Sequence, residues 1–106
     1  ALTSMKQRGL IRQVGASTKT VAGGLLALDM LDLAMVTFNM TDQSQQPVLD
    51  YASKLGKSVI IKKALSSGHA VEVGKSLKHA LHQAAVASVI VGTINEEHLR
   101  YNLSQI

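Results

Sequence analysis

The sequence has 106 residues, of which 46% are hydrophobic but only 3% aromatic, so one domain or part of one would have a mainly aliphatic core. The absence of cysteine excludes disulfides and thiolate metal sites, and no apolar run approaches the ~20 residues of a membrane-spanning helix. The net charge of +4 is modest and its basic residues are scattered, which fits a small anionic ligand better than nucleic acid. We therefore expect a cytoplasmic protein with neither nucleic-acid nor membrane partners.

Strand and helix patterns alternate along the chain. In order, we expect the end of a helix (2–8), a strand (10–15), a helix (20–31), a strand (33–38), a helix (44–55), a strand (58–62), a helix (72–85), a strand (87–91) and a final helix from about residue 96. Small polar turns are expected at 16–19, 39–42 and 64–69. Gly9 and Gly56 follow predicted helix ends, and Ser44 is a plausible N-cap before Pro47. The alternation predicts parallel strands with right-handed crossovers, and no linker divides residues 1–106 into domains.

The stretch 87–102 combines a strand, a glycine turn and a helix start. Its β-branched run 89–91 is typical of a strand buried on both faces. Gly92 breaks the run, and Thr93 or Asn95 is placed to cap the helix that follows. Three residues are spaced for the buried side of that helix: Ile94, Leu99 and Leu103. The backbone N–H groups at such a helix start favour an anion, although many α/β proteins contain a similar turn.

Four segments resemble, in order, strands five to eight of the aldo-keto reductases, a family of NADPH-dependent (β/α)8-barrel oxidoreductases. They are G-L-I-R-Q-V-G-A-S (9–17), D-L-A-M-V-T-F-N-M-T-D (32–42), V-I-I-K-K-A-L-S-S-G (59–68) and S-V-I-V-G-T-I-N-E-E-H-L-R-Y-N-L (88–103). Together they cover nearly the whole chain at fitting separations. The resemblance implies an α/β fold, the C-terminal half of a (β/α)8 TIM barrel, with strands five to eight and their helices.

The resemblance also implies that the catalytic groups lie elsewhere. The family's tetrad of tyrosine, lysine, aspartate and histidine belongs to the first four strands, which have no counterpart here. His79 and His82 are spaced i, i+3 but lack a third ligand nearby, so we interpret them as solvated helix residues. Ser66, Ser67 and His69 are interpreted as a small-residue turn and not as a nucleophile elbow. We expect no catalytic residue and no metal site in this chain.

By position, the resemblance assigns a set of residues to the cofactor NADPH: Ser17, Thr18, Met35, Lys62, Lys63, Leu65, Gly92, Thr93, Asn95, His98 and Asn102. Ser17 matches the serine that holds the nicotinamide carboxamide, whereas Thr18 and Met35 stand where asparagine and glutamine are usual. Lys62 replaces the tyrosine that stacks on the nicotinamide. A lysine stem can lie along a ring, or its ammonium can pair with pyrophosphate, but it does not stack as a flat π-surface does. The alternative is that Lys62 or Lys63 is simply a solvated strand end.

The last turn matches the positions that hold the adenosine 2′-phosphate and the adenine. Thr93 and Asn95 offer hydroxyl and amide donors beside the helix N–H groups. His98 stands where an arginine is common, which weakens the expected preference for NADP over NAD. The alternative is an ordinary capped helix.

The resemblance implies an aldehyde or ketone reductase, with hydride transfer from the nicotinamide and proton transfer from a tyrosine absent here. Two alternatives remain: a non-catalytic NADPH-binding sensor or regulatory subunit of the same fold, as in potassium-channel β subunits, and a free-standing four-stranded α/β binding module. Both edge strands would lack a neighbour, and some barrel-facing side chains would lose the opposite wall. Candidates for these side chains are Ile11, Val36, Ile60 and Ile90. We therefore expect the N-terminal half of the barrel, or a second copy of this chain, as a partner.

Overall fold

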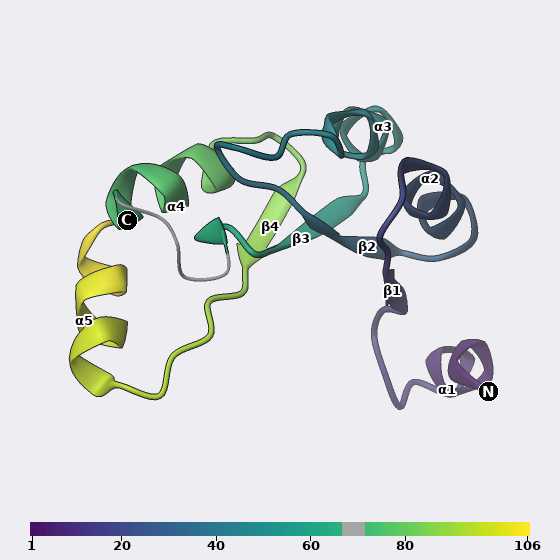
Figure 1. Ribbon diagram of the computed structural model, residues 1–106. Coiled ribbons are helices and arrows are strands. Elements are labelled where there is room, and N and C mark those ends of the chain that lie inside the picture. Colours follow the sequence, from purple (N-terminus) through teal and green to yellow (C-terminus); the bar gives the residue numbers. More distant parts are fainter. Residues whose placement is uncertain (67–71) are drawn as a thin grey trace.

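The computed structural model describes residues 1–66 and 72–106. Its elements are α1 (Leu2–Gln7), β1 (Gly15–Ser17), α2 (Val21–Met30), β2 (Leu33–Thr37), α3 (Gln46–Leu55), β3 (Ser58–Lys62), α4 (Val73–Leu81), β4 (Val86–Val89) and α5 (Glu96–Ser104). The strands form one sheet in the order β1-β2-β3-β4, and every neighbouring pair is parallel (Figure 1). The predicted alternation of parallel strands and helices is confirmed.

The core lies between one face of the sheet and the helices α2, α3 and α4. Alternate strand residues point into it, and those of the two central strands are fully buried: Ala34, Val36, Val59 and Ile61. Phe38 and Leu28 are the largest fully buried side chains of this core. Figure 1 shows α2 and α3 side by side above the sheet, whereas α1 and α5 lie at its two ends below it. Helices α2, α3 and α4 therefore cover one face of the sheet, and the other face is left open between α1 and α5.

The open face carries the intervening strand residues, which remain partly exposed. In β2 these are Leu33, Met35 and Thr37, and in β3 they are Ser58, Ile60 and Lys62. Val36 was expected among the possible barrel-facing residues, and this is wrong because the pleat of β2 directs it to the helices. Ile60 does lie on the open face, and Ile90 is 50% exposed just beyond β4. The open face is thus mixed in polarity and has no covering layer among the described residues.

The predicted first strand at residues 10–15 is wrong, since β1 contains only Gly15–Ser17. Asp32 explains why pairing starts so late. Its carboxylate accepts a hydrogen bond from the Val14 N–H at 2.8 Å and forms an ion pair with the Lys6 ammonium at 2.6 Å. The Asp32 N–H in turn donates to the Val14 carbonyl at 2.8 Å, so ladder pairing with β2 begins only at the next residue. The turn expected at 16–19 is accordingly shortened, because its first two residues belong to β1.

Two helix boundaries also differ from the sequence interpretation. Ser44 is not an N-cap, because its N–H and hydroxyl both bind the Asp42 carboxylate and α3 begins only at Gln46. Helix α4 ends at Leu81 and not at residue 85. The Ala85 carbonyl accepts the Val59 N–H at 2.9 Å, so the chain already pairs with β3 at that point. Gly56 closes α3 in a left-handed conformation, as expected.

The C-terminal segment is more exposed than the sequence indicates. Strand β4 ends at Val89 and is an edge strand, so residues 90–91 are not part of a strand buried on both faces. Ile94 is fully exposed because it precedes the helix, and Leu99 and Leu103 are 45% and 59% exposed. Among the described elements, the main neighbour of α5 is α4, and an apolar cavity separates α5 from β4, which explains this partial burial. Among the described residues, no helix is long and apolar enough to cross a membrane.

Candidate functional site

The polar residues of the open face meet at the carboxyl ends of the first three strands. The Lys62 ammonium donates a hydrogen bond to the Ser17 hydroxyl oxygen at 2.8 Å. Because Ser17 belongs to β1 and Lys62 to β3, the lysine side chain crosses the open face of β2. Met35 is the register partner of Ser17, so the three side chains share one region of this face. Lys62 is therefore more than a solvated strand end.

Thr18 is separated from this group. Its N–H donates to the Met35 carbonyl at 2.9 Å, which continues the β1–β2 ladder. Its side chain lies against α2 and lines a small apolar depression with Gly23 and Ala27. The Thr18 Oγ1 is buried and has no hydrogen-bond partner within the described part of the chain. The structure does not bring Thr18 together with the other predicted cofactor residues.

A cavity of about 370 Å³ lies between the ends of β3 and β4. It brings together four residues of the predicted cofactor set: Lys62, Lys63, Leu65 and Gly92. Ala64, Ile90 and Val91 complete an otherwise apolar lining. Two ammonium groups beside an apolar surface suit a ligand that combines an anionic group with a flat apolar part. We call this cavity the β3–β4 cleft.

The start of α5 is capped by Asn95, as one of the two sequence alternatives predicts. Its Oδ1 accepts the backbone N–H groups of Glu97 at 2.8 Å and His98 at 3.2 Å. Thr93 Oγ1 accepts the Asn95 N–H at 3.2 Å. These helix N–H groups are therefore already paired, and Glu96 adds negative charge in the first turn. An anion here would use the Thr93 hydroxyl, the His98 ring and the Asn95 amide, with some rearrangement of the cap.

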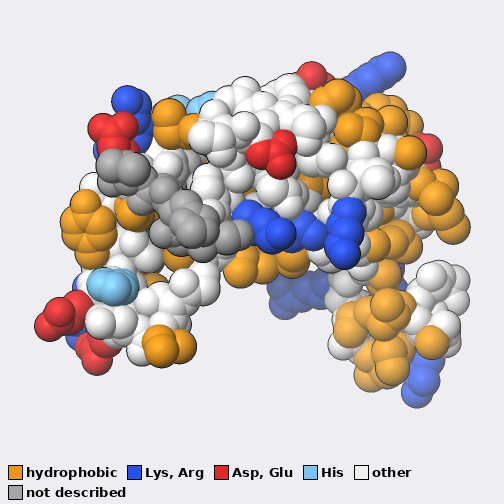
Figure 2. Space-filling view, viewed as in Figure 1, with side chains coloured by type: hydrophobic (Ala, Val, Ile, Leu, Met, Phe, Trp, Pro, Cys, Tyr) orange, Lys and Arg blue, Asp and Glu red, His pale blue; other side chains and the backbone are white. Residues whose placement is uncertain are grey.

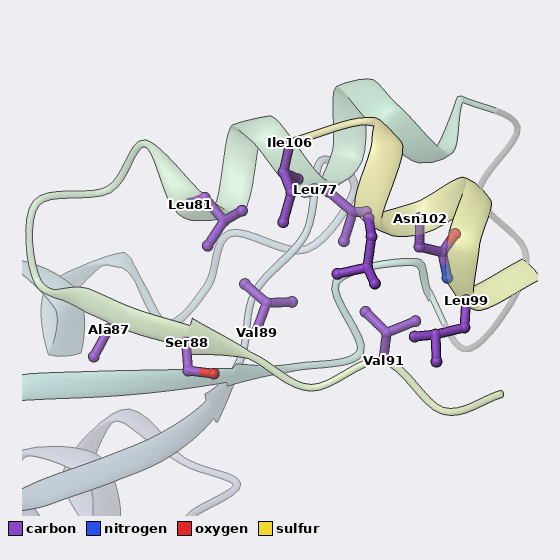
Figure 3. Close-up of a pocket in the computed structure, with 10 residues that line it drawn as sticks. Leu77, Leu81, Ala87, Ser88, Val89, Val91, Leu99, Asn102 and Ile106 are labelled. Carbon is purple, nitrogen blue, oxygen red and sulfur yellow. The ribbon is translucent and has the colours of Figure 1, made fainter.

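The remaining predicted residue, Asn102, faces a different cavity. Figure 3 shows it on α5, beside Leu99 and Val91, in an apolar space of about 310 Å³ between α4, α5 and β4. Leu77 and Leu81 of α4 line the other side of this space. Asn102 is thus near the turn that follows β4 but is not part of the β3–β4 cleft.

Asn39 is a functional candidate that the sequence interpretation missed. It lies two residues after the end of β2 and is only 4% exposed, and its side chain organises the loop. Its Oδ1 accepts the Thr41 N–H, the Thr41 hydroxyl and the Asp42 N–H at 2.7–3.0 Å. Its Nδ2 donates to the Lys63 carbonyl at 3.1 Å. An asparagine at the carboxyl end of a strand is a recognisable turn signal in a sequence. Its hydrogen-bond partner, 24 residues further along the chain, leaves no such signal.

The histidines do not converge on one point. His79 stacks on Phe38 with ring centroids 5.3 Å apart, so it is not the freely solvated residue that we expected. His82 is exposed, and its Nδ1 lies 2.6 Å from the Lys78 carbonyl. Within residues 1–66 and 72–106, no three His, Asp or Glu side chains cluster closely enough to hold a metal ion. Ser67 and His69, interpreted above as turn residues, lie outside the described residues.

Two solved structures, each described as a "putative aldo-keto reductase" from Pseudomonas aeruginosa, are similar to 98% of this chain with a TM-score of 0.88. The sequence identity is 44% in both cases. The chain spans only 40% of one of these structures and 41% of the other. No family model matches the sequence, and no curated protein matches it either.

Proposed function

We propose that this chain is the C-terminal half of an aldo-keto reductase (β/α)8 barrel and supplies the cofactor-binding half of an NADPH-dependent aldehyde or ketone reductase, since two putative aldo-keto reductases are 44% identical to it over 98% of its length. The observation that carries this proposal is the β3–β4 cleft, with Lys62 and Lys63 at its edge. In barrels of this kind, ligand phosphates bind at the carboxyl ends of the seventh and eighth strands. These are the strands that β3 and β4 resemble.

The residues around the cleft fit the parts of NADPH. The two ammonium groups suit the pyrophosphate, because each neutralises charge and donates hydrogen bonds. Ser17 is held by Lys62 at 2.8 Å, within the region that the resemblance assigns to the nicotinamide carboxamide. Thr93 and Asn95 carry hydroxyl and amide donors for the 2′-phosphate at the start of α5, where the N–H groups of Glu97 and His98 are already bound by the Asn95 side chain. When bound, the cofactor would supply the hydride.

The proton donor belongs to the complementary half of the barrel. A general acid must lie within hydrogen-bond reach of the carbonyl oxygen. Tyr51 lies on α3, where its hydroxyl binds the Asp29 carboxylate of α2 on the helix-covered side of the sheet. Tyr101 lies on α5 and is 54% exposed. Neither tyrosine belongs to a strand of the sheet, so this chain by itself is expected to reduce no carbonyl compound.

One observation favours the alternative of a non-catalytic NADPH-binding sensor or regulatory subunit. Lys62 offers no flat surface for the nicotinamide, which loosens the alignment that hydride transfer requires. Both functions need the same cofactor cleft. Oxidation of NADPH by the complete barrel with a reactive aldehyde separates them, because only the reductase consumes the cofactor.

Thermal unfolding of the complete barrel with each cofactor tests the proposal. NADPH should protect more than NADH, and a tenfold difference in affinity corresponds to about 1.4 kcal/mol of added protection. Thr93→Ala combined with Asn95→Ala should remove much of that difference. Asn95→Ala also weakens the cap of α5, by roughly 1 kcal/mol, so the quantity compared is the difference between the cofactors.

Asn95→Asp is the matched control, because aspartate caps the helix equally well but repels the 2′-phosphate. It should keep the unfolding temperature without cofactor while reducing the advantage of NADPH. Equal protection by NADPH and NADH, in the wild type and in every variant, would refute the phosphate assignment.

A further inference from the structure

A second and more polar cavity, of about 430 Å³, lies between the loops that follow β1, β2 and β3. Three lysines line it, Lys19 from the first loop and Lys62 and Lys63 from the end of β3. The latter two also line the β3–β4 cleft, so they form a shared wall between the two cavities. Figure 2 shows Lys and Arg side chains gathered near the middle of this face, above a hollow. We call this second cavity the lysine cavity.

Positive charge dominates the lysine cavity. Asp42 is the one acidic residue among the described residues that line it, and it stands against three lysines. Its carboxylate is occupied by the Ser44 N–H and hydroxyl at 3.2 and 2.7 Å. These hydrogen bonds, the hydroxyl's first, hold the pKa of Asp42 below its ordinary value. Within residues 1–66 and 72–106, no salt bridge neutralises any of the three ammonium groups, so the site favours an anion.

Gln45 is a second, independent sign of a ligand site. Gln45 is only 6% exposed, and its backbone carbonyl accepts hydrogen bonds from the N–H groups of Val48 and Leu49 at the start of α3. The backbone of Gln45 is therefore fixed at the start of α3, and the residue lines the lysine cavity. Its Oε1 is buried and lacks a hydrogen-bond donor within the part of the chain that the structure describes. A buried acceptor without a donor is unfavourable, and a hydroxyl of a bound ligand would satisfy it.

We propose that the lysine cavity binds the phosphate or carboxylate group of a small hydroxylated molecule. The oxyanion lies against Lys19, Lys63 is shared between this oxyanion and the cofactor pyrophosphate, and a ligand hydroxyl donates to Gln45 Oε1. A cavity of about 430 Å³ accommodates a molecule of a few carbon atoms.

The shared lysine wall places this molecule next to the cofactor. Provided that the proposed reductase function holds, the molecule is the carbonyl substrate, a small hydroxyaldehyde or hydroxyketone that carries an anionic group. The alternative source of the oxyanion is the pyrophosphate of the cofactor itself.

Titration of inorganic phosphate into the complete barrel, with and without saturating NADPH, separates these sources. Phosphate should bind in both conditions if the site belongs to the substrate. Loss of phosphate binding in the presence of NADPH would assign the site to the cofactor and overturn the substrate class. Lys19→Gln should weaken phosphate binding at least fivefold while leaving thermal protection by NADPH unchanged, because Lys19 does not line the β3–β4 cleft.

Lys54→Gln is the charge-matched control, since Lys54 lies in the last turn of α3 and lines neither cavity. It should leave phosphate affinity unchanged. An equal loss in Lys19→Gln and Lys54→Gln, or no loss in either, would show only a general charge effect and contradict a specific site. Phosphate binding in a barrel that binds no NADPH would keep the anion site but refute the substrate assignment.

The role of Gln45 has its own readout. The wild type should bind glycerol 3-phosphate several-fold more tightly than propyl phosphate, because only the former donates a hydroxyl hydrogen. Gln45→Met retains the volume of the side chain and removes its acceptor, so the preference should disappear while propyl phosphate binds as before. A preference that survives in Gln45→Met would exclude this contact.

Discussion

Asn39 and Lys63 join the loops that follow β2 and β3, through a hydrogen bond of 3.1 Å from the Asn39 amide to the Lys63 carbonyl. Lys63 has a φ of 58°, a left-handed conformation that is unfavourable for a residue with a Cβ. The hydrogen bond therefore helps to hold a strained residue at the wall shared by the β3–β4 cleft and the lysine cavity. Asn39 acts as a positioning residue for both cavities.

Asn39→Asp is predicted to weaken NADPH binding to the complete barrel. Aspartate keeps the acceptor for the Thr41 and Asp42 N–H groups but no longer donates to the Lys63 carbonyl. Asn39→Ala should destabilise the fold more, by about 1–3 kcal/mol, because the partly buried N–H groups of Thr41 and Asp42 also lose their acceptor. Titration with NADPH and denaturant unfolding measure the two effects. Wild-type affinity in Asn39→Asp would contradict the positioning role.

The pair of Asp32 and Lys6 is predicted to make stability depend on pH. The hydrogen bond from Lys6, and then that from the Val14 N–H, lower the pKa of Asp32 from its ordinary value of 3.8. A carboxyl group with a lower pKa in the folded state stabilises the fold above its ordinary pKa, and this contribution is lost as the pH falls through the folded-state pKa. Asp32→Asn should therefore lower the unfolding temperature at pH 7, and the difference from wild type should shrink below about pH 4. Asp50→Asn, on the exposed side of α3, is the control; a deficit in Asp32→Asn that stays constant down to pH 2 would exclude this mechanism.

Gly24 is predicted to be required for close packing of α2 on α3. A Cβ at this position would lie 2.7 and 2.9 Å from the two Val48 methyl carbons. Gly24→Ala should therefore cost about 1–3 kcal/mol, although alanine favours a helix. Val48→Ala removes both methyl groups, so Gly24→Ala should cost less in that background, as denaturant unfolding of the double-mutant cycle would reveal. The same cost in both backgrounds would mean that the predicted clash is absent.

The central sheet could be predicted from the sequence, but its edges could not. In β3, Val59 and Ile61 alternate with polar or half-buried neighbours, and this local pattern predicts the strand with correct boundaries. The start of β1 depends on hydrogen bonds between Val14 and Asp32, which a local pattern does not contain. The exposure of α5 likewise depends on which elements neighbour β4.

The candidate site, too, could be predicted from the sequence only in part. The positions of Lys62, Lys63 and Gly92 around one cleft follow from a pattern in which strand ends gather at one edge of a parallel sheet. The contact between Lys62 and Ser17 spans 45 residues, and the orientation of Thr18 toward α2 depends on the pleat of a three-residue strand. These features require the three-dimensional packing.

The isolated chain is predicted to associate and not to persist as a monomer. Strands β1 and β4 are both edges, and the open face leaves side chains such as Leu33, Met35 and Ile60 partly exposed. Each side chain of this kind gains roughly 1.5–3 kcal/mol when it is fully buried. Sedimentation at low micromolar concentration should show a dimer, or a complex with the N-terminal half when that half is present. A compact monomer that unfolds cooperatively would refute this prediction.

Hydrogen exchange of the complete barrel with and without NADPH tests the central claim, that this chain carries the cofactor cleft, most directly. Bound NADPH should slow exchange in residues 62–66, at the end of β3, and in residues 92–98, beyond β4. The amides of α2, on the covered side of the sheet, should exchange at an unchanged rate. Protection confined to segments outside this chain, or equal protection throughout it, would contradict the claim.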